Sequence, residues 1–265
     1  IVTRYADVKQ VALNNRQISA DRLTPFFKTN PEYQKGSIES LVRYLNHWMV
    51  FRDPPDHTRL RRLFNKAFTP TSVENLRPNI EDIVAHLIDG MQAKARRGET
   101  IDYIADFAYP LPASVIMDLL GVPRADLERV KVWSDDIALF IGTAQVAGNK
   151  YLRAEAGAKA MSGYFRTLVE ARTAQPRDDM ISQLVLARDD RDALSTDEII
   201  GTCILLLFAG HETTTNLIGN GFLHAMRYRG EWERLVADPT LAATAIEEFL
   251  RYDGPSGALA RVAAA

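Results

Sequence analysis

The sequence lacks the features that mark several classes of protein. Its 265 residues include one cysteine, Cys203, so no intramolecular disulfide can form and a reducing compartment such as the cytoplasm fits best. Lys and Arg number 32 against 34 Asp and Glu, so no excess of basic residues points to nucleic acid. We find no signal peptide, repeat, low-complexity tract, phosphate-binding loop or zinc-type spacing of Cys and His. No apolar run is long enough to span a bilayer, so we expect no membrane partner. The balanced charge likewise leads us to expect no nucleic-acid partner.

What the sequence does have is the composition of an ordinary globular protein, with 46% hydrophobic and 25% charged residues. Its length suits one or two domains with a sizeable core. Apolar residues recur at helical spacing along most of the chain, so we expect a mainly α protein. The expected helices are 5–14 (with Val8, Val11, Ala12 and Leu13 inward), 38–46, one after Pro54 and Pro55, 102–120, 126–140, 150–174, 195–227, 231–237 and 241–252.

The longest expected helix runs from Ser195 to about Arg227. Ser195 can cap its first turn, and Glu198, three residues on, completes a capping box. Residues 199–208 are apolar on nearly every side, which predicts a helix that is buried all round. Cys203 lies in this run, where apolar neighbours should raise its pKa and leave it as a small packed side chain.

Residues 209–215 (AGHETTT) interrupt this helix with poor helix formers. Relative to alanine, glycine costs about 1 kcal/mol and each threonine up to about 0.7 kcal/mol. The Thr213 hydroxyl can bond to the carbonyl of Ala209, which tends to bend a helix. Glu212 in the middle of such a helix risks burial, which would require a partner or a raised pKa. Lost helix stability indicates function, although a helix crossing with glycine for close packing and threonine for back-bonding explains the same pattern.

A second informative stretch is 51–64 (FRDPPDHTRLRRLF), which predicts a helix that Asp53 caps and the prolines begin. Its expected buried stripe is Leu60, Leu63, Phe64 and Phe68. His57 and Arg61 are four residues apart and therefore neighbours on one face. Together they can hold one multiply anionic ligand, since Arg offers a forked pair of donors. An ordinary solvated basic helix has the same spacing.

A third stretch, Glu248-x-x-Arg251, is a weak motif by itself, because such helical ion pairs are common. It is followed by 252–255 (YDGP) and 260–263 (ARVA). With 53–62 and 209–216 (AGHETTTN), it resembles the cytochrome P-450 superfamily of haem-thiolate monooxygenases, and most closely the soluble bacterial members. The resemblance implies a mainly α, P-450-like helical fold with a long central oxygen-binding helix and a minor β component.

The resemblance also assigns roles to residues of the central helix. In that family a carboxylate and the following threonine lie over the haem iron, so Glu212 and Thr213 would be the catalytic residues. Thr213 would hydrogen-bond to dioxygen, while Glu212 would connect the site to solvent protons. Ala209, Gly210 and Thr213 would contact the haem.

Basic residues take the other implied roles. His57 and Arg61 would bind the haem propionates, with Arg261 as a third propionate ligand.

The cations Arg59, Arg62 and Lys66 would then face an acidic electron donor of the ferredoxin type. Glu248 and Arg251 would hold the fold together.

The resemblance further implies that the irregular region from Ser19 closes over the substrate and that helices 126–140 and 150–174 form a roof above it. Phe140, Ile141 and Val146 could then touch substrate.

The implied activity is a haem-dependent monooxygenase that inserts one oxygen atom from O2 into a hydrophobic small molecule. Its cofactor would be haem b, iron protoporphyrin IX, and its electrons would come ultimately from NAD(P)H. The family's iron-ligating cysteine loop is absent, so we expect a single P-450-like domain over 1–265 that lacks its N-terminal start and its C-terminal haem-thiolate loop, and is inactive by itself. Cys203 is not expected to be the ligand, because it shares a helix with Glu212 and Thr213. Two alternatives remain: a haem-free, non-catalytic fragment, or a helical module that only binds hydrophobic ligands.

Overall fold

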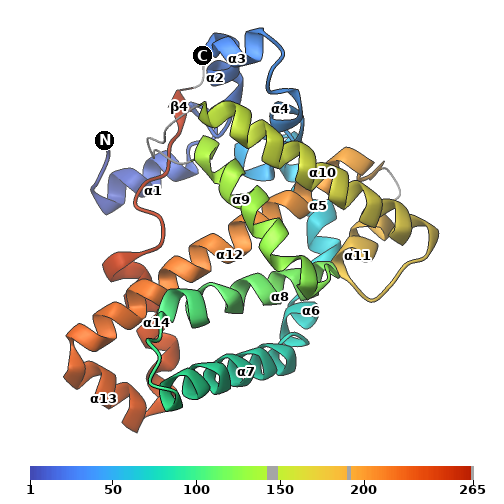
Figure 1. Cartoon of the computed structure of the whole chain (residues 1–265). Helices are drawn as coiled ribbons and strands as arrows, with labels where there is room; N and C mark the ends of the chain where they lie inside the picture. The colour runs from blue at the N-terminus through green and yellow to red at the C-terminus, as the bar shows by residue number, and fades with distance from the viewer. Residues whose placement is uncertain (142–148, 190–191, 264–265) are drawn as a thin grey trace. The chain divides into compact units, whose positions relative to one another are not determined.

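The computed structural model describes residues 1–141, 149–189 and 192–263. The chain divides into two compact units (Figure 1). Unit 1 comprises 1–70, 120–206 and 260–265, and unit 2 comprises 71–119 and 207–259. Helices dominate both, as the sequence predicts.

Unit 1 contains most of the short elements. Its helices are α1 (Tyr5–Leu13), α2 (Leu23–Thr29), α3 (Pro31–Gln34), α4 (Glu39–Leu45), α5 (Asp56–Ala67), α9 (Leu127–Ile141), α10 (Lys150–Ala174) and α11 (Met180–Leu186). Two antiparallel pairs of two-residue strands supply the minor β component. Strand β1 (Ile18–Ser19) pairs with β4 (Val262–Ala263), and β2 (Arg188–Asp189) pairs with β3 (Asp192–Ala193).

The core of unit 1 is built around the packing of α4, α9 and α10. Trp48, Leu41 and Phe165 are almost completely buried. The Glu155 carboxylate on α10 accepts the backbone N–H groups of Ser40 and Leu41 at 3.1 and 2.8 Å, which satisfies donors at the start of α4. These contacts fix the segment that precedes α5.

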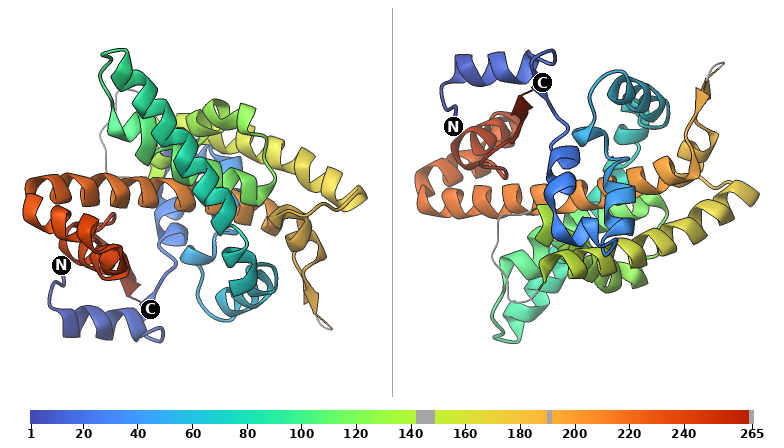
Figure 2. Two further views of the ribbon diagram at one scale, coloured as in Figure 1. Left: turned by 90° about the horizontal axis from the view of Figure 1, so that it is seen from below. Right: turned by 90° about the horizontal axis from the view of Figure 1, so that it is seen from above.

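Unit 2 contains α6 residues beyond 70, α7 (Arg77–Arg96), the π-helical turn Ile104–Ala108, α8 (Pro110–Leu120), α13 (Arg229–Ala237) and α14 (Ala242–Asp253). α6 itself spans Pro70–Glu74. The long helix α12 (Thr196–Arg227) begins in unit 1 and continues through unit 2. Figure 2 shows it in orange as one continuous helix. The rings of Tyr103 and Phe222 stack with centroids 4.0 Å apart and join the π-helical turn to α12.

Three local expectations are wrong. The residues of α1 do not point into a core, since none is buried and Val8 and Leu13 are 46% and 73% exposed. Asp53 does not cap α5, because its carboxylate accepts from the Ser19 hydroxyl and from the Ala20 amide instead. Phe68 is half-buried rather than buried, because it follows the last helical residue of α5.

The predicted helix 102–120 is divided at Tyr109. The π-helical turn occupies Ile104–Ala108, and α8 begins at Pro110. Proline is well suited to the first position of a helix because it has no N–H to satisfy there.

Candidate functional site

The start of α12 has the predicted cap. The Ser195 amide donates to the Glu198 carboxylate at 2.8 Å, and the Glu198 amide donates to the Ser195 hydroxyl at 3.3 Å. This reciprocal pair is the capping box that the spacing predicts.

Within residues 209–215 of α12, the structure contains the predicted hydrogen bond from Thr213 to the backbone. The Thr213 hydroxyl donates to the Ala209 carbonyl at 2.8 Å. Nδ1 of His211 lies 2.6 Å from the Leu207 carbonyl, and since a carbonyl only accepts, that nitrogen carries the proton. Two carbonyls of α12 therefore accept side-chain donors within one turn of each other.

Gly210 permits close packing within unit 2. A Cβ at this position would lie 3.2 Å from the side chain of Ile116 on α8. Close packing and back-bonding, the two elements of the purely structural explanation, are therefore both present. They position the motif without deciding what its exposed side chains do.

The exposed side chains of the motif are Glu212, Thr213 and Thr214, whereas His211 and Thr215 are buried. Glu212 therefore avoids the burial that its sequence position risked: the helix is apolar up to Phe208, but Glu212 itself is exposed. The Thr215 hydroxyl is buried without a hydrogen-bond partner among the described residues. Glu212, Thr213 and Thr214 are thus the accessible polar side chains of this motif.

The basic side chains of α5, in unit 1, differ in their neighbours. Arg59 binds the carboxylates of Asp192, at 3.0 Å, and Glu198, so it ties α5 to the start of α12. The hydrogen bond from Arg59 lowers the pKa of Asp192 below its ordinary value. Arg62 and Lys66 also have partners.

His57 and Arg61, by contrast, have no side-chain hydrogen bond or ion pair within the described ranges. His57 is half-buried and Arg61 is exposed. Two adjacent side-chain donors without a partner among the described residues fit the carboxylates of a haem. The sequence spacing predicts that the two side chains share one face of α5, and among the described residues neither has a hydrogen-bond or ion-pair partner.

Arg261 immediately precedes β4. It is exposed, and its guanidinium donates to the neighbouring Ala260 carbonyl at 2.9 Å. Burial alone would raise the pKa of nearby Asp53, but hydrogen bonds from Ser19 and the backbone, together with the charge of Arg261, lower it overall.

No motif in the sequence marks Arg22 as a functional residue. Arg22 follows β1 and is half-buried without a hydrogen-bond or ion-pair partner among the residues described. Strands of two residues are too short to leave an alternating pattern in the sequence, so the sequence does not predict the β1–β4 pairing that lies beside Arg22 and Arg261.

Glu248 and Arg251 form the expected ion pair on α14, with contacts of 2.7 and 2.6 Å. The hydrogen bond from Arg251 lowers the pKa of Glu248. Their side chains are 55% and 68% exposed. An ion pair that is so exposed to water contributes little to the free energy of unfolding.

Cys203 is completely buried and has no disulfide partner. Burial, and after it the charge of Asp179, raises the pKa of its thiol, as the apolar flanks predict. No three His, Cys, Asp or Glu side chains in the described part of the chain could hold a metal ion together. The residues present therefore fit the carboxylate edge of a haem and do not include a thiolate for its iron.

Phe140, one of the expected substrate-contacting residues, lies in an aromatic cluster of unit 1. Its ring centroid is 5.4 Å from that of Phe26 and 5.7 Å from that of Phe27. Ile141 ends α9, and Val146 lies outside the described residues.

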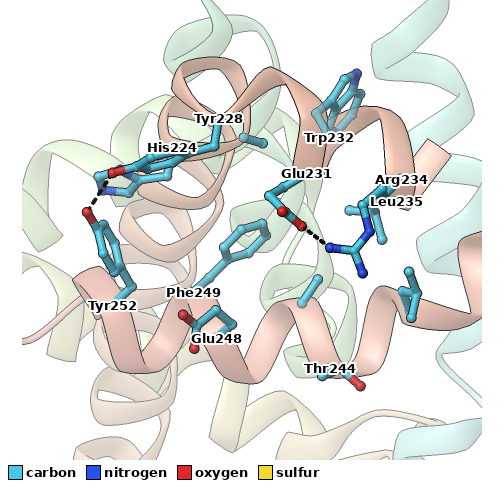
Figure 3. A pocket seen from close by; sticks show the side chains of 13 residues that line it. His224, Tyr228, Glu231, Trp232, Arg234, Leu235, Thr244, Glu248, Phe249 and Tyr252 are labelled. Atoms are coloured by element: carbon cyan, nitrogen blue, oxygen red, sulfur yellow. Dashed lines mark hydrogen bonds and ion pairs between the residues drawn. The ribbon is translucent and has the colours of Figure 1, made fainter.

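A pocket of about 430 Å³ opens in unit 2 among α12, α13 and α14 (Figure 3). Glu231 of α13 and Phe249 of α14 point toward one another across it. His224 on its wall is eleven residues beyond Thr213, which is about 16 Å along the helix axis. This pocket is therefore separate from the motif at 209–215.

None of the helices within the described ranges has both the length and the apolar character required to cross a membrane.

Comparison with known proteins connects these observations. Residues 1–238 match the family model described as Cytochrome P450. A biotin biosynthesis cytochrome P450 of Bacillus subtilis (strain 168) is 38% identical over 242 residues, covering 91% of this chain and 58% of that protein. A vitamin D(3) 25-hydroxylase of Pseudonocardia autotrophica is 36% identical over 256 residues, covering 96% and 59%.

Among solved structures, P450BioI in complex with acyl carrier protein ligated to hexadec-9Z-enoic acid superposes with a TM-score of 0.87 at 35% identity. That match covers 99% of this chain and 64% of the other. The chain thus spans less than two thirds of the length of each of these relatives.

Proposed function

Because this chain belongs to the cytochrome P450 family, we propose that the full-length protein is a haem-dependent monooxygenase that inserts one oxygen atom from O2 into a hydrophobic small molecule. Its fold is the P450 helical fold with a long central helix and few strands. The observation that carries the proposal is the stretch 209–215 of α12, where the Thr213 hydroxyl bonds to the Ala209 carbonyl beside the exposed Glu212.

Thr213 and Glu212 are the proposed catalytic residues. The single hydroxyl hydrogen of Thr213 donates to Ala209, so its lone pairs remain to accept a hydrogen bond, and rotation of the side chain frees the hydrogen for donation. Glu212 is exposed and can exchange protons with water. Together they would hold and deliver protons at the oxygen site.

Haem b is the proposed cofactor, with its propionates bound by His57, Arg61 and Arg261. Ala209, Gly210 and Thr213 would contact it from α12. When bound, it would supply oxygen activation, which in this family depends on a thiolate ligand to the iron. The free donors of His57 and Arg61 support this assignment.

The proposed electron donor is a ferredoxin-type protein, with electrons ultimately from NAD(P)H, in the cytoplasm. It would dock on the basic face formed by Arg59, Arg62 and Lys66. Arg62 and Lys66 are exposed, and their positive charges would attract an acidic partner together with that of Arg59.

The proposed substrate class is supported by the names of two relatives and by apolar side chains of unit 1. The name of the 36% identical relative is vitamin D(3) 25-hydroxylase, and P450BioI was solved with a fatty acid on acyl carrier protein. Both molecules are hydrophobic. The aromatic cluster of Phe26, Phe27 and Phe140 supports a substrate of the same kind.

The test is the coupling of electrons to product in the full-length protein. Thr213→Ala should keep haem binding but divert electrons to peroxide or water, which lowers product formed per NAD(P)H consumed by about tenfold or more. Thr213→Ser retains the hydroxyl and should stay near the wild-type ratio. An unchanged ratio in Thr213→Ala would sink the assignment.

A further inference from the structure

Arg22 has a guanidinium group that is partly withdrawn from water without a matching acceptor. It is half-buried, and within the described residues its side chain makes no hydrogen bond or ion pair. Its Cζ lies 4.8 Å from the centroid of the Phe51 ring. Stacking engages the flat face of a guanidinium and leaves the N–H donors along its edge available.

The β1–β4 ladder brings a second arginine to the same place. Ser19, the last residue of β1, pairs with Val262, the first residue of β4. Arg261 immediately precedes Val262, and Arg22 follows Ser19 by three residues, so both arginines flank the same end of the ladder. Arg261 bonds only to the carbonyl of its neighbour Ala260 among the described residues. Burial, and after it the charge of Arg261, lowers the pKa of Arg22.

The carboxylates of Asp21 and Asp53, which lie near Arg22 in the chain and at β1, have hydrogen-bond donors of their own; Asp21 accepts from the Thr24 amide and hydroxyl. Asp53 is engaged by the Ser19 hydroxyl and, at 2.8 Å, by the Ala20 amide. Its backbone carbonyl accepts the His57 amide at 3.0 Å, so Asp53 ties β1 to the beginning of α5. That helix carries His57 and Arg61, whose side chains make no hydrogen bond or ion pair within the described residues.

We propose that Arg22 is a further carboxylate-binding residue of the haem site, acting beside Arg261. The inference rests on the proposed function and adds to it a ligand that no motif of the chain indicated. A partly buried guanidinium next to another one becomes favourable when an anion binds between or beside them, because each then gains charge-assisted hydrogen bonds. A haem carries two carboxylates, and His57 with Arg61 account for only part of the donors present.

The test compares two porphyrins in the full-length protein: haem, and haem dimethyl ester, in which both carboxylates are masked. Arg22→Ala should weaken haem binding by about tenfold or more and leave affinity for the diester unchanged. Arg22→Lys keeps the positive charge but not the forked pair of donors, so its haem affinity should fall between those of the wild type and Arg22→Ala. The double substitution His57→Leu and Arg61→Leu should show the same selective loss and serves as the reference.

The matched control is Arg16→Ala, which removes an exposed arginine of the same segment and should change neither affinity. Equal haem affinity in Arg22→Ala and wild type would overturn the inference while leaving the proposed function intact. An equal loss for haem and diester would also overturn it, because the arginine would then act through the fold. A wild-type protein that binds neither porphyrin would refute the proposed function and this inference together.

Discussion

At the scale of single residues, the cations of α5 illustrate what spacing does and does not determine. Helical periodicity places His57 and Arg61 on one face, and neither side chain has a hydrogen-bond or ion-pair partner among residues 1–141, 149–189 and 192–263. The same periodicity treats Arg59 as another surface charge. In the structure Arg59 binds two acidic side chains that lie 133 and 139 residues further along the chain, a relation that no local pattern contains.

Arg59→Ala is therefore expected to destabilise unit 1 at neutral pH. Because Arg59 lowers the pKa of Asp192, the stabilisation from this pair is fully present above the unfolded-state pKa of Asp, about 3.9, and is lost as pH falls through the lowered folded-state value. The difference between variant and wild type in urea unfolding should thus be clear at pH 7 and shrink in strong acid.

Arg234→Ala is the control, because its pair with Glu231 is 68% and 69% exposed and should contribute little at either pH. If Arg59→Ala unfolds like wild type at pH 7 but is reduced more slowly by the electron donor, Arg59 belongs to the docking surface and its ion pairs are dispensable.

Asp53 and Glu212 show the limit of residue-level inference. Asp53 stands in a good capping position, yet the hydroxyl and amide of the distant Ser19–Ala20 segment compete for it. Glu212 follows an apolar run, yet its position on the helix turns it outward. Both outcomes depend on which surface a neighbouring segment covers, and a local pattern does not carry that information.

At the scale of elements, α12 was the most predictable part of the chain. Its capping box and its threonine back-bond each join residues within four positions of one another, so a local pattern predicts them. Its length follows from the apolar run that the sequence shows. The π-helical turn before α8 and the two-residue strands depend on tertiary contacts and were not predicted at their observed bounds.

The packing of α9 against α10 can be tested with two glycines of the same helix. A Cβ at Gly157 would lie 2.7 Å from the Trp133 carbonyl, whereas one at Gly163 would meet nothing within 4 Å. Gly163→Ala should stabilise the protein by up to about 1 kcal/mol through helix propensity. Gly157→Ala should instead destabilise it by about 1–3 kcal/mol, because a backbone carbonyl cannot move aside as a flexible side chain can.

Urea midpoints of the two glycine variants make the comparison, and each serves as the other's control. Equal midpoints would mean that α9 and α10 are not in close contact at Gly157.

At the scale of the whole molecule, the family and the mainly α fold follow from three short motifs, and the comparisons confirm both. The division into two compact units does not follow from them, since each unit is assembled from separate stretches of sequence. The same holds for the meeting of Arg22 with Arg261 across the β1–β4 ladder, which joins residues more than two hundred positions apart. Contacts of that range are set by the packing of complete helices.

The most direct test of the central claim is the absorption spectrum of the ferrous–CO form of the full-length protein. We expect the band position typical of thiolate ligation, and the same position in Cys203→Ala, because Cys203 is buried with a raised pKa on the helix that carries Thr213. The 265 residues alone, with haem added, should not give that band. Absence of the thiolate-type band from the full-length protein, or its loss in Cys203→Ala, would contradict the account.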